Sequence, residues 1–156
     1  MRRDFQLPGR SPVIAGEGMA ATSHPLATLA AIDVMRLGGN AVDAAVTAVA
    51  VLCVIEPHMT GIGGDCFALI AEDGKPVWGY NGCGRSGAKA STDALLAKGM
   101  RTIEPTSPHA VNVPGAIEAW DAILKARGTI TLERALAPAI RYAEGGFPVS
   151  ARVASD

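Results

Sequence analysis

Residues 38–65 read GGNAVDAAVTAVAVLCVIEPHMTGIGGD, and this stretch decides the fold. Its opening Gly-Gly pair ends any preceding helix, and Asn40 is a good N-cap for the next one. Residues 41–55 are apolar on nearly every face, which is typical of a helix surrounded by other elements. Residues 60–64 then form a glycine-rich turn before a run that favours a β-strand. The stretch therefore predicts a buried helix joined by a glycine turn to a sheet.

The flanking sequence predicts further helices and one hairpin. A helix is expected to begin at Ser23, whose hydroxyl can cap it, with Pro25 in its first turn. Strands are expected over 66–71 and 76–80, joined by a two-residue Asp73-Gly74 turn. The other expected elements are an extended lead-in over 1–18 with a short strand at 13–15, a helix over 92–98, a loop over 100–114, a helix from Pro114 to Gly128, a helix capped by Thr131 with Pro138 inside it, and the start of another helix at 150–156.

Helical spacing predicts the buried faces of the last two complete helices. The expected stripes are Ile117, Trp120 and Leu124 in the first helix, and Leu132, Leu136 and Ile140 in the second.

Composition excludes several classes of protein. The 156 residues are 49% apolar and 19% charged, which does not fit a disordered chain. The net charge is −1, so neither nucleic acid nor an anionic membrane is an expected partner. The apolar run over 41–55 is shorter than the roughly 20 residues of a membrane-spanning helix. Residues 1–18 contain arginines but no apolar run, so we expect a soluble, reduced, cytoplasmic protein without a secretory signal.

The cysteine and histidine patterns predict no metal site. Cys53, Cys66 and Cys83 are an odd number without a CxxC pair, which fits neither a disulfide framework nor a zinc site. Cys53 lies on the apolar helix and is expected to pack in the core.

Two glycine-rich segments carry residues that could do chemistry. Residues 82–87 (GCGRSG) match GxGxxG, but the expected helix begins too late for a dinucleotide loop, so a turn after the hairpin is favoured. Arg85 within it could present its guanidinium to a carboxylate, although a solvated arginine is the simpler interpretation. Glu56, His58 and Asp65 could serve acid–base work or metal binding, but hydrogen bonds at the helix end and in the loop are favoured. Residue chemistry alone leaves the function open.

Several motifs together resemble one known family. They are TSHPLA at 22–27, LGGNAVDAA at 37–45, EPHMTGIGGD at 56–65, GR at 84–85, PG at 114–115 and AEGGF at 143–147. Their order and spacing, from residue 13 to the end, are similar to the N-terminal part of the large subunit of the γ-glutamyltransferase (γ-glutamyltranspeptidase) family.

The resemblance implies an α+β fold: a fragment of the four-layer αββα N-terminal-nucleophile hydrolase, mostly helical here with a glycine-flanked hairpin. Residues 1–156 would form one incomplete domain. Such enzymes are made as inactive precursors that cut themselves into a large and a small subunit. The new N-terminal threonine of the small subunit attacks γ-glutamyl amides such as glutathione, and no separate cofactor is needed. The implied partners are the substrate, the rest of the large subunit and the small subunit of the same precursor.

Residue by residue, the resemblance implies that Arg85 binds the α-carboxylate of the γ-glutamyl group. Many transpeptidases have an acidic residue after this arginine, whereas here it is Ser86, as in a more divergent branch. The nucleophile and the oxyanion hole would lie outside this chain, so no catalytic or metal residue is assigned and the chain alone is expected to be inactive. The alternatives are an amidase or acylase of the same fold acting on another acyl group, such as glutaryl, and a non-catalytic binding module.

Overall fold

The computed structural model describes residues 12–155. The elements in chain order are α1 (Pro25–Arg36), α2 (Ala41–Ile55), β1 (Cys66–Ile70), β2 (Trp78–Gly82), α3 (Thr92–Ala97), the 3-10 helix η1 (Pro108–Ala110), α4 (Ala116–Arg127), α5 (Leu132–Gly145) and α6 (Ala151–Ser155). The expected lead-in falls partly on residues 1–11, which lie outside the described residues, as does Asp156.

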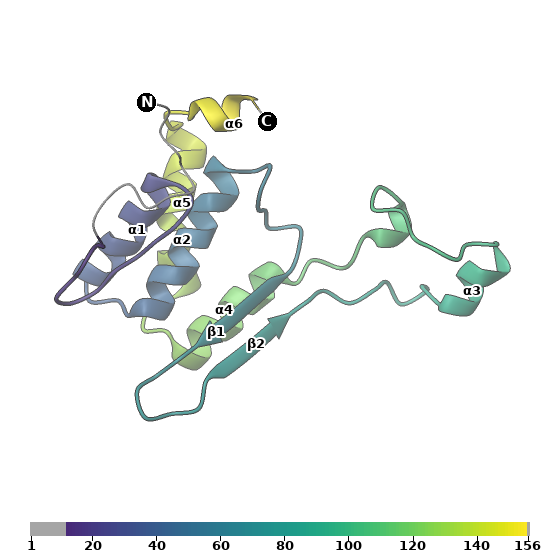
Figure 1. Cartoon of the computed structure of the whole chain (residues 1–156), viewed down its shortest axis with the longest axis horizontal. Helices are drawn as coiled ribbons and strands as arrows, with labels where there is room; N and C mark the ends of the chain where they lie inside the picture. Colours follow the sequence, from purple (N-terminus) through teal and green to yellow (C-terminus); the bar gives the residue numbers. More distant parts are fainter. Residues whose placement is uncertain (1–11, 156) are drawn as a thin grey trace.

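Helix α2 is the centre of the core, as its apolar sequence predicts. It packs against α1, α5 and α4, and buries Ala44, Val51 and Ile55 among them. Figure 1 shows α1, α2 and α5 as one bundle, with the hairpin in front of α4 and residues 83–115 extending away from the bundle. The side of α2 that carries Ala41 and Ala45 is exposed, so the described residues surround this helix incompletely.

The start of α2 is held by a reciprocal cap and by a distant turn. Asn40 accepts hydrogen bonds from the N–H groups of Val42 and Asp43, and the Asp43 carboxylate accepts one from the N–H of Asn40. The fully buried Asp43 also accepts from the Thr129 N–H (2.9 Å), the Thr129 hydroxyl (2.6 Å) and the Ile130 N–H (3.3 Å). One carboxylate thus joins α2 to the turn between α4 and α5.

These hydrogen bonds also decide the ionisation of Asp43. Burial raises its pKa, but the hydrogen bonds from Thr129, Asn40 and Ile130 stabilise the charged form and leave the pKa below its ordinary value. The carboxylate is therefore charged in the folded protein at neutral pH.

The two strands form an antiparallel pair that runs from Cys66 opposite Gly82 to Ile70 opposite Trp78. The expected two-residue turn is wrong, because residues 71–77 connect the strands. A tight turn does lie within them: Gly74 has φ +68°, and the Lys75 N–H donates to the Glu72 carbonyl at 3.1 Å. The returning strand begins at Trp78 instead of Pro76, in keeping with the absence of an N–H group in proline.

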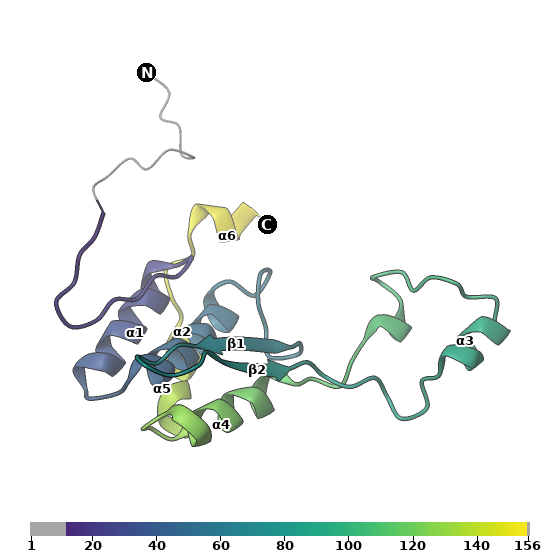
Figure 2. The same ribbon diagram turned by 60° about the horizontal axis from the view of Figure 1, so that its bottom comes forward.

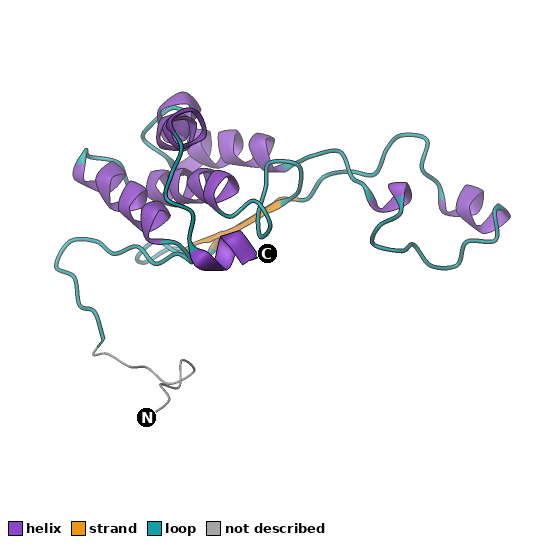
Figure 3. Cartoon of the chain, turned by 90° about the horizontal axis from the view of Figure 1, so that it is seen from above, coloured by secondary structure: helices purple, strands orange, loops and turns teal. Residues whose placement is uncertain are grey.

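The two faces of the hairpin have different surroundings. Cys66, Ala68 and Ile70 pack against the helical core, whereas Phe67 and Leu69 point the other way and are 68% and 82% exposed. Figure 2 shows the two strands lying over α4, and in Figure 3 most of the helices lie on one side of the strands. The described part of the sheet therefore has one covered and one open face.

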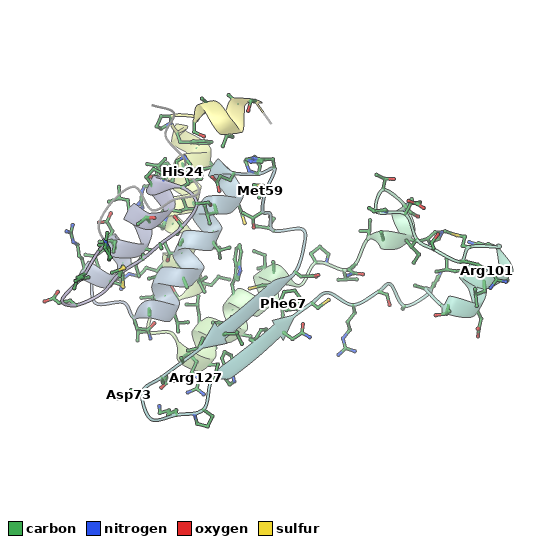
Figure 4. The ribbon with its side chains drawn as sticks, viewed as in Figure 1. His24, Met59, Phe67, Asp73, Arg101 and Arg127 are labelled. Carbon is green, nitrogen blue, oxygen red and sulfur yellow. The ribbon has the colours of Figure 1, made fainter. Side chains whose placement is uncertain are left out.

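The turn end of the hairpin is tied to the end of α4 by Arg127. Its guanidinium lies 3.0 Å from the Glu72 carboxylate and 5.5 Å from the centre of the Trp78 ring. Figure 4 shows Arg127 close to this end of the hairpin. The pair is partly exposed, so solvent screens it and its contribution to stability is small.

Two predictions near the N-terminus are wrong. Residues 13–15 form no strand; the described sheet contains β1 and β2 alone. The N-cap of α1 is His24 and not Ser23: His24 Nδ1 accepts from the Leu26 N–H at 3.2 Å, while the Ser23 hydroxyl donates to Glu56 at the end of α2. Pro25 occupies the first turn, as predicted.

The later helices follow the sequence with smaller corrections. Helix α4 begins at Ala116 and not at Pro114, with Gly115 as its N-cap. Thr131 caps α5 as predicted, and that helix continues through Pro138. The expected helices near 92–98 and 150–156 are present as α3 and α6.

The predicted stripes of α4 and α5 are only partly buried. In α4, Trp120 and Leu124 are buried, but Ile117 is exposed. In α5 the buried residues are Ala135 and Ala139; Leu132 and Leu136 are half-buried and Ile140 is exposed. Helix α5 packs mainly against α2 and buries its small alanines more deeply than its larger side chains.

Candidate functional site

Three segments far apart in the sequence meet at one end of the hairpin. Asp65 directly precedes β1, residues 83–85 directly follow β2, and residues 113–115 lead into α4. The Gly64 carbonyl accepts hydrogen bonds from the N–H groups of Gly115 and Ala116, both at 3.0 Å. The glycine loop before β1 thereby supplies an acceptor to the first N–H groups of α4, which no side chain caps.

Close backbone approach explains the glycines at this junction. A Cβ on Gly82 would overlap the side chain of Ala119, and a Cβ on Gly84 would overlap the carbonyl of Val113. A Cβ on Gly115 would in turn overlap the carbonyl oxygen of Gly82. The third glycine of the GxGxxG match, Gly87, lies in open space, and the next helix begins at Thr92. Residues 83–87 of the motif follow β2 as irregular chain without a turn, so the turn favoured from the sequence is wrong, and the motif also lacks the helix that a dinucleotide loop needs.

The backbone of the loop that carries Arg85 is held at three successive residues. The Cys83 N–H donates to Asn81 Oδ1 (3.0 Å) and the Gly84 N–H donates to Asp65 Oδ1 (2.8 Å). The Arg85 carbonyl accepts from the Val113 N–H at 2.9 Å. This loop is therefore ordered although it has no regular secondary structure.

The Arg85 side chain, by contrast, is exposed. It forms no ion pair with any residue in the described part of the chain. An arginine with a fixed backbone and an unpaired guanidinium can offer two parallel N–H groups to a carboxylate. The arrangement can bind an anion, and it contains no nucleophile of its own.

The ionisable residues Glu56, His58 and Asp65 do not form one cluster. Glu56 accepts from the Ser23 hydroxyl (2.5 Å), which agrees with the favoured hydrogen-bonding role. His58 is exposed in the turn after α2. Within residues 12–155, no group of three His, Cys, Asp or Glu side chains could hold a metal ion.

The contact between Asp65 and the Arg85 loop was not predicted from the sequence. Besides accepting from the Gly84 N–H, its Oδ2 atom lies 3.6 Å from the Cys83 Sγ atom, which can donate its proton. The signal in the sequence is an acidic residue at the junction of a glycine turn and a strand, but its partner follows only from the strand pairing.

The thiols are not activated. Partial desolvation and the neighbouring Asp65 carboxylate raise the pKa of Cys83, and burial raises the pKa of both Cys53 and Cys66. A raised pKa keeps a thiol protonated and weakly nucleophilic at neutral pH. Cys53 packs against the core, as expected.

No helix within the described residues is long and apolar enough to cross a bilayer.

The sequence and the fold match known proteins over nearly the whole chain. A sequence profile described as gamma-glutamyltranspeptidase matches residues 27–156. The glutathione hydrolase-like YwrD proenzyme of Bacillus subtilis strain 168 is 44% identical over 140 residues, which are 89% of this chain and 26% of that protein. This chain thus spans about a quarter of the length of that relative.

Two solved structures are similar in three dimensions. The Helicobacter pylori gamma-glutamyltranspeptidase is 33% identical with a TM-score of 0.82, covering 93% of this chain and 42% of that one. The cephalosporin acylase of Bacillus halodurans is 40% identical with a TM-score of 0.80, covering 95% and 29%. These similarities confirm the predicted fold class, part of an N-terminal-nucleophile hydrolase. The chain belongs to the gamma-glutamyltranspeptidase family.

Proposed function

We propose that the protein containing this chain transfers or hydrolyses the acyl group of γ-glutamyl amides, and that Arg85 binds the α-carboxylate of that group. The observation that carries the assignment is the exposed Arg85 guanidinium, which forms no ion pair with any of residues 12–155, on a loop whose backbone is hydrogen-bonded at residues 83, 84 and 85. A binding residue gains from such order, because less conformational entropy is lost when the substrate binds. Family membership and a glutathione hydrolase-like relative support the same reaction.

In this proposal the chain supplies substrate binding, and another part of the protein supplies the chemistry. An N-terminal threonine on the small subunit attacks the amide carbonyl, the amine leaves, and the acyl-enzyme passes to water or to an acceptor amine. The name proenzyme on the relative supports a precursor that is processed in this way. The rest of the large subunit and the small subunit are then the partners, residues 1–156 belong to the N-terminal part of the large subunit, and no cofactor takes part.

A cytoplasmic location belongs to the same proposal. Cys53, Cys66 and Cys83 are all free thiols, which suits a reducing compartment. Cell fractionation tests this part separately, and recovery of the enzyme outside the cytoplasm would contradict it.

An acylase of the same fold is the second candidate. The similarity to a cephalosporin acylase favours it, and so does Ser86, which stands where many transpeptidases have an acidic residue. A glutaryl group retains the carboxylate that Arg85 would bind and lacks the α-amino group. Arg85 therefore serves both candidates, and turnover of γ-glutamyl against glutaryl anilides separates them.

The role of Arg85 is tested by Arg85→Ala in the full-length enzyme. Loss of a bidentate charged hydrogen bond of about 2–3 kcal/mol predicts a decrease in kcat/KM of roughly 30- to 150-fold for the γ-glutamyl anilide, mainly through KM. The 4-aminobutyryl anilide has no α-carboxylate, so its turnover should not change. Arg101→Ala is the matched control, since Arg101 is exposed near α3, far from the junction (Figure 4). An unchanged kcat/KM for the γ-glutamyl anilide in Arg85→Ala would refute the assignment.

A further inference from the structure

We propose that Asp65 is a positioning residue for substrate binding: it holds the Arg85 loop in the conformation that receives the carboxylate. This inference rests on the proposed function of Arg85. The evidence is that both oxygens of the Asp65 carboxylate engage the two residues directly before Arg85. Oδ1 accepts from the Gly84 N–H at 2.8 Å, and Oδ2 lies 3.6 Å from the Cys83 Sγ atom.

Asp65 can act as an anchor because its own backbone neighbours are fixed. On one side, the Gly64 carbonyl accepts from the first N–H groups of α4. On the other side, Cys66 is paired with Gly82 in the hairpin. The carboxylate therefore connects a rigid junction to the loop, across 19 residues of sequence.

Apart from the hydrogen bonds of the Cys83 N–H and the Arg85 carbonyl, the loop has few other restraints. Residues 85–91 are exposed and a Cβ on Gly87 would meet no atoms, so packing does not define the path of the chain. Glycine at position 84 is required by the nearby Val113 carbonyl, and it is also the residue with the widest backbone freedom. Removing the acceptor for the Gly84 N–H would let the Cys83–Gly84 peptide, one residue before Arg85, rotate. The guanidinium would then sample orientations that do not meet the substrate.

We expect the hydrogen-bond acceptor that Asp65 offers to the Gly84 N–H, and not its negative charge, to position the loop. Asn at position 65 keeps an oxygen at the Oδ1 position for the Gly84 N–H, whereas Ala removes it. A charge close to the carboxylate site would in itself repel an anionic substrate, so its loss in Asp65→Asn should not reduce binding. The two variants therefore separate loop positioning from direct electrostatics.

The experiment compares Asp65→Ala, Asp65→Asn and the control Asp73→Ala in the full-length enzyme. Asp73 is exposed at the opposite end of the hairpin (Figure 4). We expect Asp65→Ala to raise KM for the γ-glutamyl anilide about tenfold, with little change in kcat and none for the 4-aminobutyryl anilide. Asp65→Asn should stay within threefold of the wild type. In an Arg85→Ala background, Asp65→Ala should have no further effect.

A measurement that does not depend on activity accompanies the kinetics. Hydrogen exchange in the peptide that contains Gly84 should accelerate about tenfold in Asp65→Ala and stay unchanged in Asp65→Asn. Unchanged exchange in Asp65→Ala would overturn the positioning role, even if that variant were inactive.

The kinetic outcomes distinguish this inference from the function on which it rests. Equal losses on both anilides, or a further loss in the Arg85→Ala background, would show a general structural role and overturn the proposal. Equal losses in Asp65→Asn and Asp65→Ala would overturn it in favour of the charge itself. If Arg85→Ala alone has no effect on the γ-glutamyl anilide, the proposed function of Arg85 fails, and the positioning role fails with it.

Discussion

Replacing Asp43 with alanine should open the link between α2 and the turn after α4 without touching the Arg85 loop. The carboxylate accepts from the backbone N–H groups of Asn40, Thr129 and Ile130 and from the Thr129 hydroxyl. Asp43→Ala deprives all four donors of their acceptor and leaves a small void at a fully buried position.

The size of the effect follows from those contacts. A hydrogen bond to a charged group is worth about 1.5–3 kcal/mol. Thr129 is exposed and Ile130 is half-buried, so water recovers part of the loss there. We expect a destabilisation of about 3 kcal/mol in total. Thr129→Val removes one donor and should cost about 1 kcal/mol, and Asp33→Ala on the exposed face of α1 should cost less than about 0.5 kcal/mol.

Native-state hydrogen exchange measures this locally, in the full-length protein. Peptides covering residues 40–47 and 127–132 should exchange on the order of a hundredfold faster in Asp43→Ala, as 3 kcal/mol requires. Peptides covering residues 83–90 should be unaffected. If Asp43→Ala accelerates exchange no more than Asp33→Ala does, the buried carboxylate does not hold these elements together.

Two further predictions concern pH and the junction glycines. Folding lowers the pKa of Asp43, so its contribution to stability is complete above the unfolded pKa of roughly 4 and is lost as pH falls through the lower, folded value. Hydrogen exchange in residues 127–132, measured as a function of acid pH, checks this. The pH dependence should disappear in Asp43→Asn. Gly84→Ala should decrease kcat/KM for the γ-glutamyl anilide at least tenfold, since its Cβ would overlap the Val113 carbonyl. Gly87→Ala, whose Cβ would meet no atoms, should leave kcat/KM unchanged. Equal kinetics for the two variants would contradict the close approach of Gly84 to Val113.

The features that the sequence predicted correctly depend on contacts between residues a few positions apart. The caps Asn40 and Thr131 bind N–H groups two or three positions ahead, so the starts of α2 and α5 are visible in the sequence. Ser23 is the instructive exception. Its hydroxyl is suited to a cap, but it donates its hydrogen bond to Glu56, 33 residues further on, and His24 caps the helix.

The part of the candidate site that the sequence did not predict depends on contacts between residues far apart in the chain. Arg85 could be proposed from a resemblance, but Asp65 contacts Gly84 only because β1 and β2 pair in a particular register. Likewise, the partners of Asp43 in the turn after α4 lie 86 and 87 residues away. The sequence shows that a residue can accept hydrogen bonds; the fold determines which donors reach it.

The two acyl groups also test how Asp65 acts. Arg85 can bind a carboxylate, which γ-glutamyl and glutaryl groups share, whereas the glutaryl group lacks the α-amino group. The exposed Asp65 carboxylate accepts from the Gly84 N–H and lies 3.6 Å from the Cys83 Sγ atom, and its two oxygens have lone pairs left for further donors. If Asp65 acts only by positioning the loop, substitutions at Asp65 should change KM for both acyl groups by the same factor. A larger change for the γ-glutamyl anilide would show that Asp65 also contacts the α-amino group.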